Sequence, residues 1–152
     1  MERENLRGID AMPVGANPFR RHARCVVPES HLDLLTRPLL AHLGTVRPDG
    51  SPQVNPMWFL WDGAYVRFTH ASTAQKYRNV QADPRVSVCI DDPGQQARFI
   101  ELRGRVERVE PDPDAAFFAE LAKRYSMEGV SPPSGVSVRV VMWVRPETAV
   151  YL

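Results

Sequence analysis

The chain has only two cysteines among its 152 residues, Cys25 and Cys89. They are too few for the disulfide framework that stabilises small secreted domains. No apolar run approaches the ~20 residues that span a bilayer, and no early apolar segment has the pattern of a secretory signal. The 19 basic and 18 acidic residues leave a formal net charge of +1, which gives no reason to expect a polyanionic partner. We therefore expect a cytoplasmic protein that binds neither nucleic acid nor membranes.

Motifs for self-contained catalysis are also missing. The sequence has no Gly-x-Gly-x-x-Gly, no P-loop, no His-Glu-x-x-His and no Gly-x-Ser-x-Gly. The four histidines, His22, His31, His42 and His70, are scattered along the chain. We expect each to lie on the surface or to be hydrogen-bonded within the fold, and we expect no metal site. No residue stands out as catalytic, so an enzyme built on this chain would rely on a bound cofactor for its chemistry.

The length and composition are those of one globular domain. The chain is 43% hydrophobic and 24% charged, and a domain of this size buries roughly 68–70% of the surface its unfolded form exposes. Residues 1–28 lack periodicity and include the basic cluster 20–24, so they are predicted to form an N-terminal arm on the surface. The alternative is that the arm folds over a partner subunit or over the acidic tail of a ligand. Residues 29–152 are predicted to form the domain.

Short alternating segments with hairpin-length connections dominate the domain. They predict six strands, at 39–46, 53–60, 65–70, 86–90, 99–108 and 136–144, of which the first three form an antiparallel meander. Three short helices are expected, capped by Ser30, Ser72 and Asp112. Pro146 is expected to end the last strand. The predicted fold is mainly β (α+β), an antiparallel barrel that is closed or nearly closed, with short flanking helices.

The start of the second predicted helix is suited to an anion. Ser72 is the expected N-cap, and Gln75 three residues later would complete a capping box. The free backbone N–H groups and positive end of the helix dipole attract phosphate, and Lys76 adds a full positive charge. The same residues equally fit an ordinary capped helix with a solvated lysine. Both interpretations remain open at this point.

The segment Gln53-Val54-Asn55-Pro56-Met57-Trp58-Phe59 is unusual for a strand. Pro56 has no N–H to donate to a ladder, so it indicates an edge strand or a bulge. An irregular edge strand leaves backbone groups free to pair with a flat heterocycle. Alternatively, Pro56 turns a barrel corner while Trp58 and Phe59 pack in the core.

Several segments, taken in order, resemble the pyridoxamine-phosphate-oxidase-like split β-barrel flavoproteins. The similarity is strongest to a branch of small actinobacterial proteins that use the deazaflavin F420 or FMN. It covers roughly residues 30–150 and is carried by PLLAHLGTVRPDGSPQV (38–54), WF (58–59), KYRNV (76–80), DPRV (83–86), LRGRV (102–106) and AKRY (122–125).

The resemblance implies a six-stranded split barrel of the FMN-binding type. It implies a homodimer with two cofactors at the subunit interface. The strand from Gln53 to Trp58 would lie along the cofactor ring, while Thr69, Lys76 and Asn79 would hold the phosphate. Arg139 is a further candidate, because the last strand of the partner subunit often contributes a residue. The expected cofactor-binding residues are Gln53, Val54, Asn55, Pro56, Met57, Trp58, Thr69, Ser72, Gln75, Lys76, Asn79 and Arg139.

One position departs from the family pattern. Members of the family commonly have arginine two positions before the phosphate-binding lysine, where this chain has Ala74. The lost charge-assisted hydrogen bond corresponds to about 1.5–3 kcal/mol, for which Gln75 would compensate in part.

The resemblance favours F420 over FMN. Arg20, Arg21 and Arg24, or Arg78 and Arg85, could meet the acidic tail that F420 carries and FMN lacks. The expected activity is hydride transfer from reduced F420 to a small electron-poor substrate such as an enone or imine. The alternatives are an FMN-dependent oxidase or reductase and a non-catalytic protein that binds such a cofactor.

Overall fold

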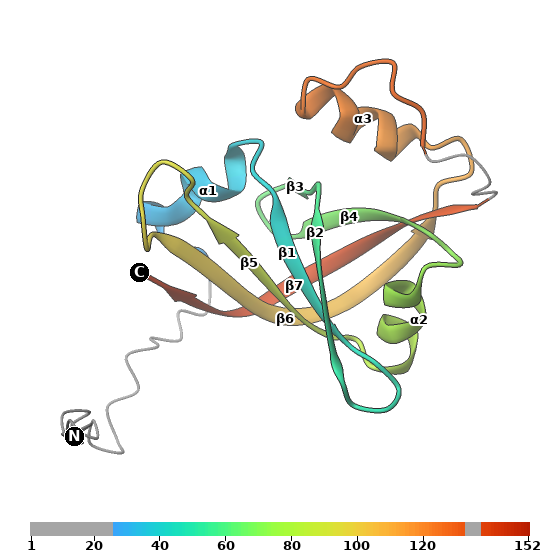
Figure 1. The fold of residues 1–152 in the computed structure, drawn as a ribbon, viewed down its shortest axis with the longest axis horizontal. Coiled ribbons are helices and arrows are strands. Elements are labelled where there is room, and N and C mark those ends of the chain that lie inside the picture. Colours follow the sequence, from blue (N-terminus) through green and yellow to red (C-terminus); the bar gives the residue numbers. More distant parts are fainter. Residues whose placement is uncertain (1–25, 133–137) are drawn as a thin grey trace, which may run out of the picture.

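The computed structural model describes residues 26–132 and 138–152. Within them, the chain forms one antiparallel sheet of seven strands in the order β2-β1-β5-β6-β7-β4-β3. The sheet curls strongly (Figure 1), so the mainly β antiparallel prediction is confirmed, with seven strands instead of six. The strands are β1 (Ala41–Val46), β2 (Pro52–Met57), β3 (Leu60–Trp61), β4 (Val66–Ala71), β5 (Arg85–Asp91), β6 (Phe99–Pro111) and β7 (Arg139–Tyr151). The predicted arm falls almost entirely outside the described residues.

Short helices flank the sheet. They are a 3-10 turn η1 (Glu29–His31), α1 (Leu32–Thr36), α2 (Gln75–Ala82) and α3 (Ala116–Arg124). No helix within residues 26–132 and 138–152 has both the length and the apolar character to cross a bilayer.

All three predicted helix caps are wrong. Ser30 lies inside η1, where its Oγ is 2.9 Å from Nδ1 of His31. Ser72 and the capping box with Gln75 fail because Ser72 and Thr73 form a turn after β4, in which the Ala74 N–H donates to the Ala71 carbonyl at 3.0 Å. Helix α2 therefore begins only at Gln75 and has no side-chain cap. Asp112 is not the N-cap as predicted, because α3 begins at Ala116 and its N-cap is Ala115. Its carboxylate nevertheless accepts hydrogen bonds from the first two backbone N–H groups of α3, at 2.9 and 3.2 Å.

The predicted strand at 53–60 is interrupted. It divides into β2 and β3 at Trp58 and Phe59, and Phe59 turns inward and is fully buried. The predicted three-strand meander is therefore wrong, because β2 pairs only with β1, whereas β3 pairs with β4. The two outermost strands of the sheet are consecutive in sequence and are joined through Trp58 and Phe59, without pairing with each other.

The last strand does not end at Pro146 as predicted. It continues to Tyr151, and Pro146 lies at an irregularity of register where Gly104 pairs with Pro146 but Arg103 pairs with Thr148. Proline is tolerated at such a bulge, where a ladder hydrogen bond is already lost. A side chain on Gly104 would overlap the carbonyl oxygen of Arg145, which explains the glycine.

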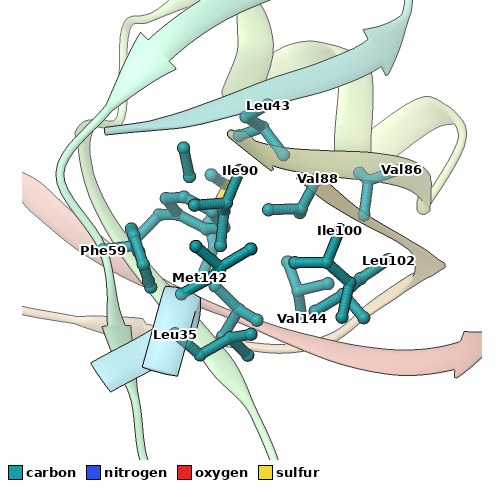
Figure 2. Close-up of a cluster of buried hydrophobic side chains, with 14 of the residues drawn as sticks. Leu35, Leu43, Phe59, Val86, Val88, Ile90, Ile100, Leu102, Met142 and Val144 are labelled. Atoms are coloured by element: carbon teal, nitrogen blue, oxygen red, sulfur yellow. The ribbon is translucent and has the colours of Figure 1, made fainter. Parts of the chain in front are cut away.

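The main core fills the inside of the curl. Figure 2 shows its side chains arriving from β1, β5, β6 and β7, with Leu35 of α1 and Phe59 of the link. The predicted alternation of β5 is confirmed, because Val86, Val88 and Ile90 are all buried in this core. A second, smaller cluster joins Phe117 and Leu121 of α3 to Val141 of β7. It attaches α3 to the face of β7 opposite the main core.

Candidate functional site

The paired ends of β4 and β7 lie directly before α2. Their register places Thr69 opposite Val141, His70 opposite Val140, and Ala71 opposite Arg139. The backbone N–H of Ser72 continues the pairing by donating to the carbonyl of Val138 at 3.0 Å. The chain then enters α2, whose first N–H groups have no acceptor within the helix. Sheet pairing thus fixes the position of this helix start.

Arg139 is a buried cation in this region. Its side chain is 8% exposed, its Nε donates to Thr69 Oγ1 at 3.1 Å, and its guanidinium carbon is 4.9 Å from the centre of the Phe118 ring. Burial lowers the pKa of Arg139, and the nearby carboxylate of Asp112 opposes that effect. Asp112 accepts hydrogen bonds from α3, and among the described residues Arg139 forms no ion pair.

Lys76 is a second cation without an acidic partner in the described chain. Its Nζ lies 3.3 Å from the thioether sulfur of Met57, which is a weak acceptor. Burial lowers the pKa of this half-buried ammonium. Since removing a cation from water is unfavourable without compensation, the site is electrostatically suited to an anion.

His70 is a buried histidine of β4 that no sequence pattern singles out for the site. It is 6% exposed, and its buried Nε2 has no hydrogen-bond partner. Burial, and then the charges of Lys76 and Arg139, lower the pKa of His70 to about 3, so the imidazole is uncharged at neutral pH. The expectation of a surface or hydrogen-bonded histidine is therefore wrong here. The signal was the alternation of Val66, Phe68 and His70, which places His70 on the buried face of β4.

A chain of amide hydrogen bonds connects α2 to β2. Gln75 donates to Asn79 Oδ1 at 2.9 Å, and Asn79 Nδ2 donates to Thr45 Oγ1 at 3.0 Å and to Gln53 Oε1 at 3.1 Å. Gln53 in turn donates to Asn55 Oδ1 at 2.9 Å. Asn79 is fully buried with its carboxamide in use, so its position suits holding β2 against α2.

The two faces of β2 differ in their surroundings. Gln53 and Met57 contact α2, and Asn55 is hydrogen-bonded to Gln53. On the opposite face Val54 is 62% exposed, and Pro56 is also exposed. With β1 as its single neighbour, β2 is an edge strand, which confirms the interpretation of Pro56 as an edge residue.

Trp58 and Ser72 lie apart from the amide chain. The Trp58 ring stacks on Tyr125, with centroids 5.1 Å apart and an interplanar angle of 10°, so it packs with α3. Ser72 contributes its backbone N–H to the end of the ladder with β7.

The remaining reactive side chains form no second centre. Among residues 26–132 and 138–152, no three His, Cys, Asp or Glu side chains gather closely enough to hold a metal ion. Burial and the charges of Glu101 and Asp91 raise the pKa of Cys89, which favours the unreactive thiol. Cys25 lies outside the described residues.

Comparison with known proteins identifies the family. The family model described as pyridoxamine 5'-phosphate oxidase matches residues 27–152. The chain belongs to the pyridoxamine 5'-phosphate oxidase family. None of the curated proteins matches the chain. The family assignment confirms the resemblance that the sequence segments carry.

Solved structures of similar proteins agree with the assignment. An F420 reductase is 49% identical, with a TM-score of 0.77, and the match covers 82% of this chain and 98% of that protein. A conserved hypothetical protein from Mycobacterium tuberculosis is 22% identical, with a TM-score of 0.63 and coverage of 86% and 87%. General Stress Protein 26 from Bacillus anthracis is 20% identical, with a TM-score of 0.60 and coverage of 82% and 92%. The last two are similar in fold alone, and together the matches confirm the split-barrel architecture.

Proposed function

We propose that this protein is an F420-dependent oxidoreductase that reduces small electron-poor organic molecules, such as enones or imines. Membership of the pyridoxamine 5'-phosphate oxidase family supports redox chemistry on a flavin-type cofactor. Similarity to a protein named an F420 reductase supports the deazaflavin.

The observation that carries the proposal is the pair of cations at the start of α2. Arg139 is buried and Lys76 is half-buried, and in the described chain neither forms an ion pair. The free N–H groups of the first turn of α2 add positive potential in the same region. A phosphate group would add the close negative charge that neither cation has in an ion pair within the described chain.

The residues around these cations have separable roles in the proposal. Lys76 and Arg139 would bind the phosphate, with Thr69 holding the guanidinium in place through the 3.1 Å hydrogen bond. The ring would lie along β2, whose outer edge has backbone groups without ladder partners. Asn79 and Gln53 would fix the distance between the phosphate and ring positions, because they connect α2 to β2. When bound, reduced F420 supplies the hydride, and the protein supplies orientation and electrostatics.

FMN is the second candidate cofactor. Two cations without an ion pair also suit a phosphomonoester, which carries close to two negative charges at neutral pH. An FMN-dependent oxidase or reductase would use the same residues. A protein that binds either cofactor without turnover is the non-catalytic alternative, for which Ala74 in place of arginine is the argument.

The proposal includes a homodimer with the cofactors at the interface. Exposed apolar side chains on and near the free edge of the sheet, Val54 and Leu40, are consistent with a covered surface there. Sedimentation of the full chain at several concentrations would test this part separately. A monomer at micromolar concentration would remove the partner subunit from the proposal.

Parallel titration of the purified protein with F420 and FMN, followed by absorbance and fluorescence, tests the cofactor assignment. We expect tight binding of F420 and weaker binding of FMN. A substrate panel of enones and imines with the F420-loaded protein then tests turnover. Preferential binding of FMN would make FMN the assigned cofactor. Failure of both cofactors to bind at micromolar concentration would refute the proposal.

A further inference from the structure

The amide side chains between α2 and β2 form a chain of hydrogen bonds with a fixed direction. A guanidinium can only donate, so the contact from Arg78 Nη2 to Gln75 at 2.8 Å requires the carbonyl oxygen of Gln75 at that point. The amide nitrogen of Gln75 must then face Asn79, and it donates to Asn79 Oδ1 at 2.9 Å. Asn79 consequently turns its Nδ2 towards β1 and β2. A cation therefore sets the direction of the chain at its α2 end.

A second cation requires the same direction at the β2 end. Gln53 Oε1 accepts from Asn79 Nδ2 at 3.1 Å and from Arg47 Nε at 3.3 Å. Because both donors meet the oxygen of Gln53, its amide nitrogen must face the other way, where it donates to Asn55 Oδ1 at 2.9 Å. The reverse orientation of Asn55 would place two amide nitrogens against each other. The carbonyl oxygen of Asn55 is thus held by Gln53.

Asn55 ends the chain with a free donor. Its Nδ2 is open to solvent, and within the described part of the chain no group accepts a hydrogen bond from it. Asn55 lies between Gln53 and Met57 on the face of β2 that contacts α2, where Gln53 is bonded to Asn79 and Met57 contacts Lys76. Side chains two positions apart on a strand are about 7 Å apart. The free amide therefore lies one such step along β2 from the contact with Lys76.

We propose that Asn55 is a specificity-determining residue of the cofactor site, which donates a hydrogen bond from Nδ2 to a carbonyl oxygen of the cofactor ring. This inference rests on the proposed function, which places the ring along β2. A carbonyl oxygen satisfies a donor whose orientation Arg47 and Arg78 determine from the two ends of the chain. A ring edge with an N–H group at the same place would bring two donors together without an acceptor.

Side-chain amide exchange in the cofactor-free protein tests the orientation of Asn55 by itself. In 15N-labelled protein we expect slow exchange for the NH2 groups of Asn79 and Gln53, which are hydrogen-bonded, and fast exchange for that of Asn55. Gln53→Glu removes the donor to Asn55 Oδ1, so the Asn55 amide should reverse, donate to the introduced carboxylate and become protected from exchange. Slow exchange at Asn55 in the free wild-type protein would overturn the inference.

Cofactor titrations of matched variants test the contact. Asn55→Ala removes the donor and should weaken binding of F420 about fivefold, which corresponds to one neutral hydrogen bond. Gln53→Glu should weaken binding about tenfold or more, because the reversed amide presents its oxygen to the ring carbonyl. The introduced charge acts with or without Asn55, so the effect of Gln53→Glu should be smaller in the Asn55→Ala background. Gln81→Glu adds the same charge at an exposed position of α2 and should leave the affinity almost unchanged.

The results distinguish this inference from the proposed function. Tight binding of F420 with equal affinities for wild type and Asn55→Ala would overturn the inference and leave the proposed function intact. Failure of both F420 and FMN to bind would refute the proposed function, and with it the ligand assigned to Asn55. Titration with inorganic phosphate identifies the acceptor. Equal phosphate affinity in wild type and Asn55→Ala supports the ring carbonyl, whereas weaker phosphate binding in the variant would assign the donor to the phosphate and overturn the inference.

Discussion

The hydroxyl of Tyr125 lies 2.6 Å from the carbonyl oxygen of Leu39 and 3.1 Å from the backbone nitrogen of Phe59. It donates to the first and accepts from the second. The neighbouring Arg124 donates to the carbonyls of Thr36 and Arg37 at 3.0 and 2.7 Å. The end of α3 thereby fastens the chain that enters β1 to the link between β2 and β3. One hydroxyl therefore connects α3 to both of these segments.

Tyr125→Phe removes this connection while retaining the ring that stacks on Trp58. We expect a loss of about 1–3 kcal/mol in the free energy of unfolding, because the Phe59 N–H and the Leu39 carbonyl lose a shared partner. Denaturant unfolding measures the change. Tyr65→Phe is the control, since its hydroxyl bonds Glu107 in an exposed setting and should contribute less than about 1 kcal/mol. Equal effects of the two substitutions would contradict the role assigned to Tyr125.

Gly104→Ala should disrupt the bulge between β6 and β7. Its new Cβ would overlap the carbonyl oxygen of Arg145, so a strand must shift, and we expect at least about 1–3 kcal/mol of destabilisation. Gly44→Ala is the control, because the nearest atom to a Cβ there is 3.4 Å away. Thermal melts of both variants test the difference. A stable Gly104→Ala protein would mean that the irregularity can move along the strand.

Lys76→Ala should weaken cofactor binding about tenfold or more, since it removes one of the two cations assigned to the phosphate. The free energy of unfolding without cofactor should change by no more than about 1 kcal/mol, because Lys76 has a single weak contact with Met57. Binding titration measures the cofactor affinity, and denaturant unfolding measures the free energy of unfolding. Lys123→Ala removes the only other lysine, at an exposed position of α3, and should leave affinity unchanged. If Lys76→Ala binds the cofactor as tightly as wild type, the phosphate does not bind at Lys76.

Ala74→Arg restores the side chain that related sequences commonly have before this lysine. Ala74 is the residue directly before α2, so a guanidinium there would add a positive charge at the helix start where the phosphate is proposed to bind. We expect about tenfold or greater tightening of F420 binding, corresponding to one charge-assisted hydrogen bond. Ala82→Arg places the same charge at the exposed far end of α2 and should have little effect. Similar gains from both variants would indicate general charge attraction instead of a local contact.

The stability of the cofactor-free protein should fall with acid partly through His70. In the folded chain the pKa of His70 is about 3, below its ordinary value of 6.5, so between these values the unfolded chain binds the proton more readily. The associated stability is complete above pH 6.5 and is lost progressively as the pH falls toward 3. Urea unfolding at intervals from pH 7.5 to 4 should show a smaller acid-induced loss in His70→Gln. Parallel curves for the two proteins would show that His70 is not buried in its uncharged form.

Local patterns in the sequence predicted much of the barrel. Alternation located β5 and β6, and glycine and proline marked the hairpin turns. The errors arose where distant residues decide the outcome. Ser72 fails as a cap because a turn closed between Ala71 and Ala74 separates it from the start of α2. Pro146 continues a strand because Gly104, far away in sequence, accommodates the bulge beside it.

The candidate site was predictable in its parts but not in its connections. Helix-start chemistry identified Lys76, and family resemblance suggested Thr69 and Arg139. Sequence spacing could not show that Asn79 uses its carboxamide within the protein. Nor could it show that the His70 imidazole is enclosed with no partner, since both facts depend on how β2, β4 and α2 meet.

The order of the strands also determines where this barrel is mechanically weakest. No ladder hydrogen bond in the described chain joins β2 to β3, although Trp58 and Phe59 connect them covalently. Separation of β2 from β3 would leave every pair of strands intact and would break the hydrogen bonds of Tyr125. The β1–β2 hairpin would remain attached to α2 through Asn79 during such a movement. The link between β2 and β3 is therefore the one place where the sheet can open without breaking a strand pair. It lies beside β2, the strand assigned to the cofactor ring.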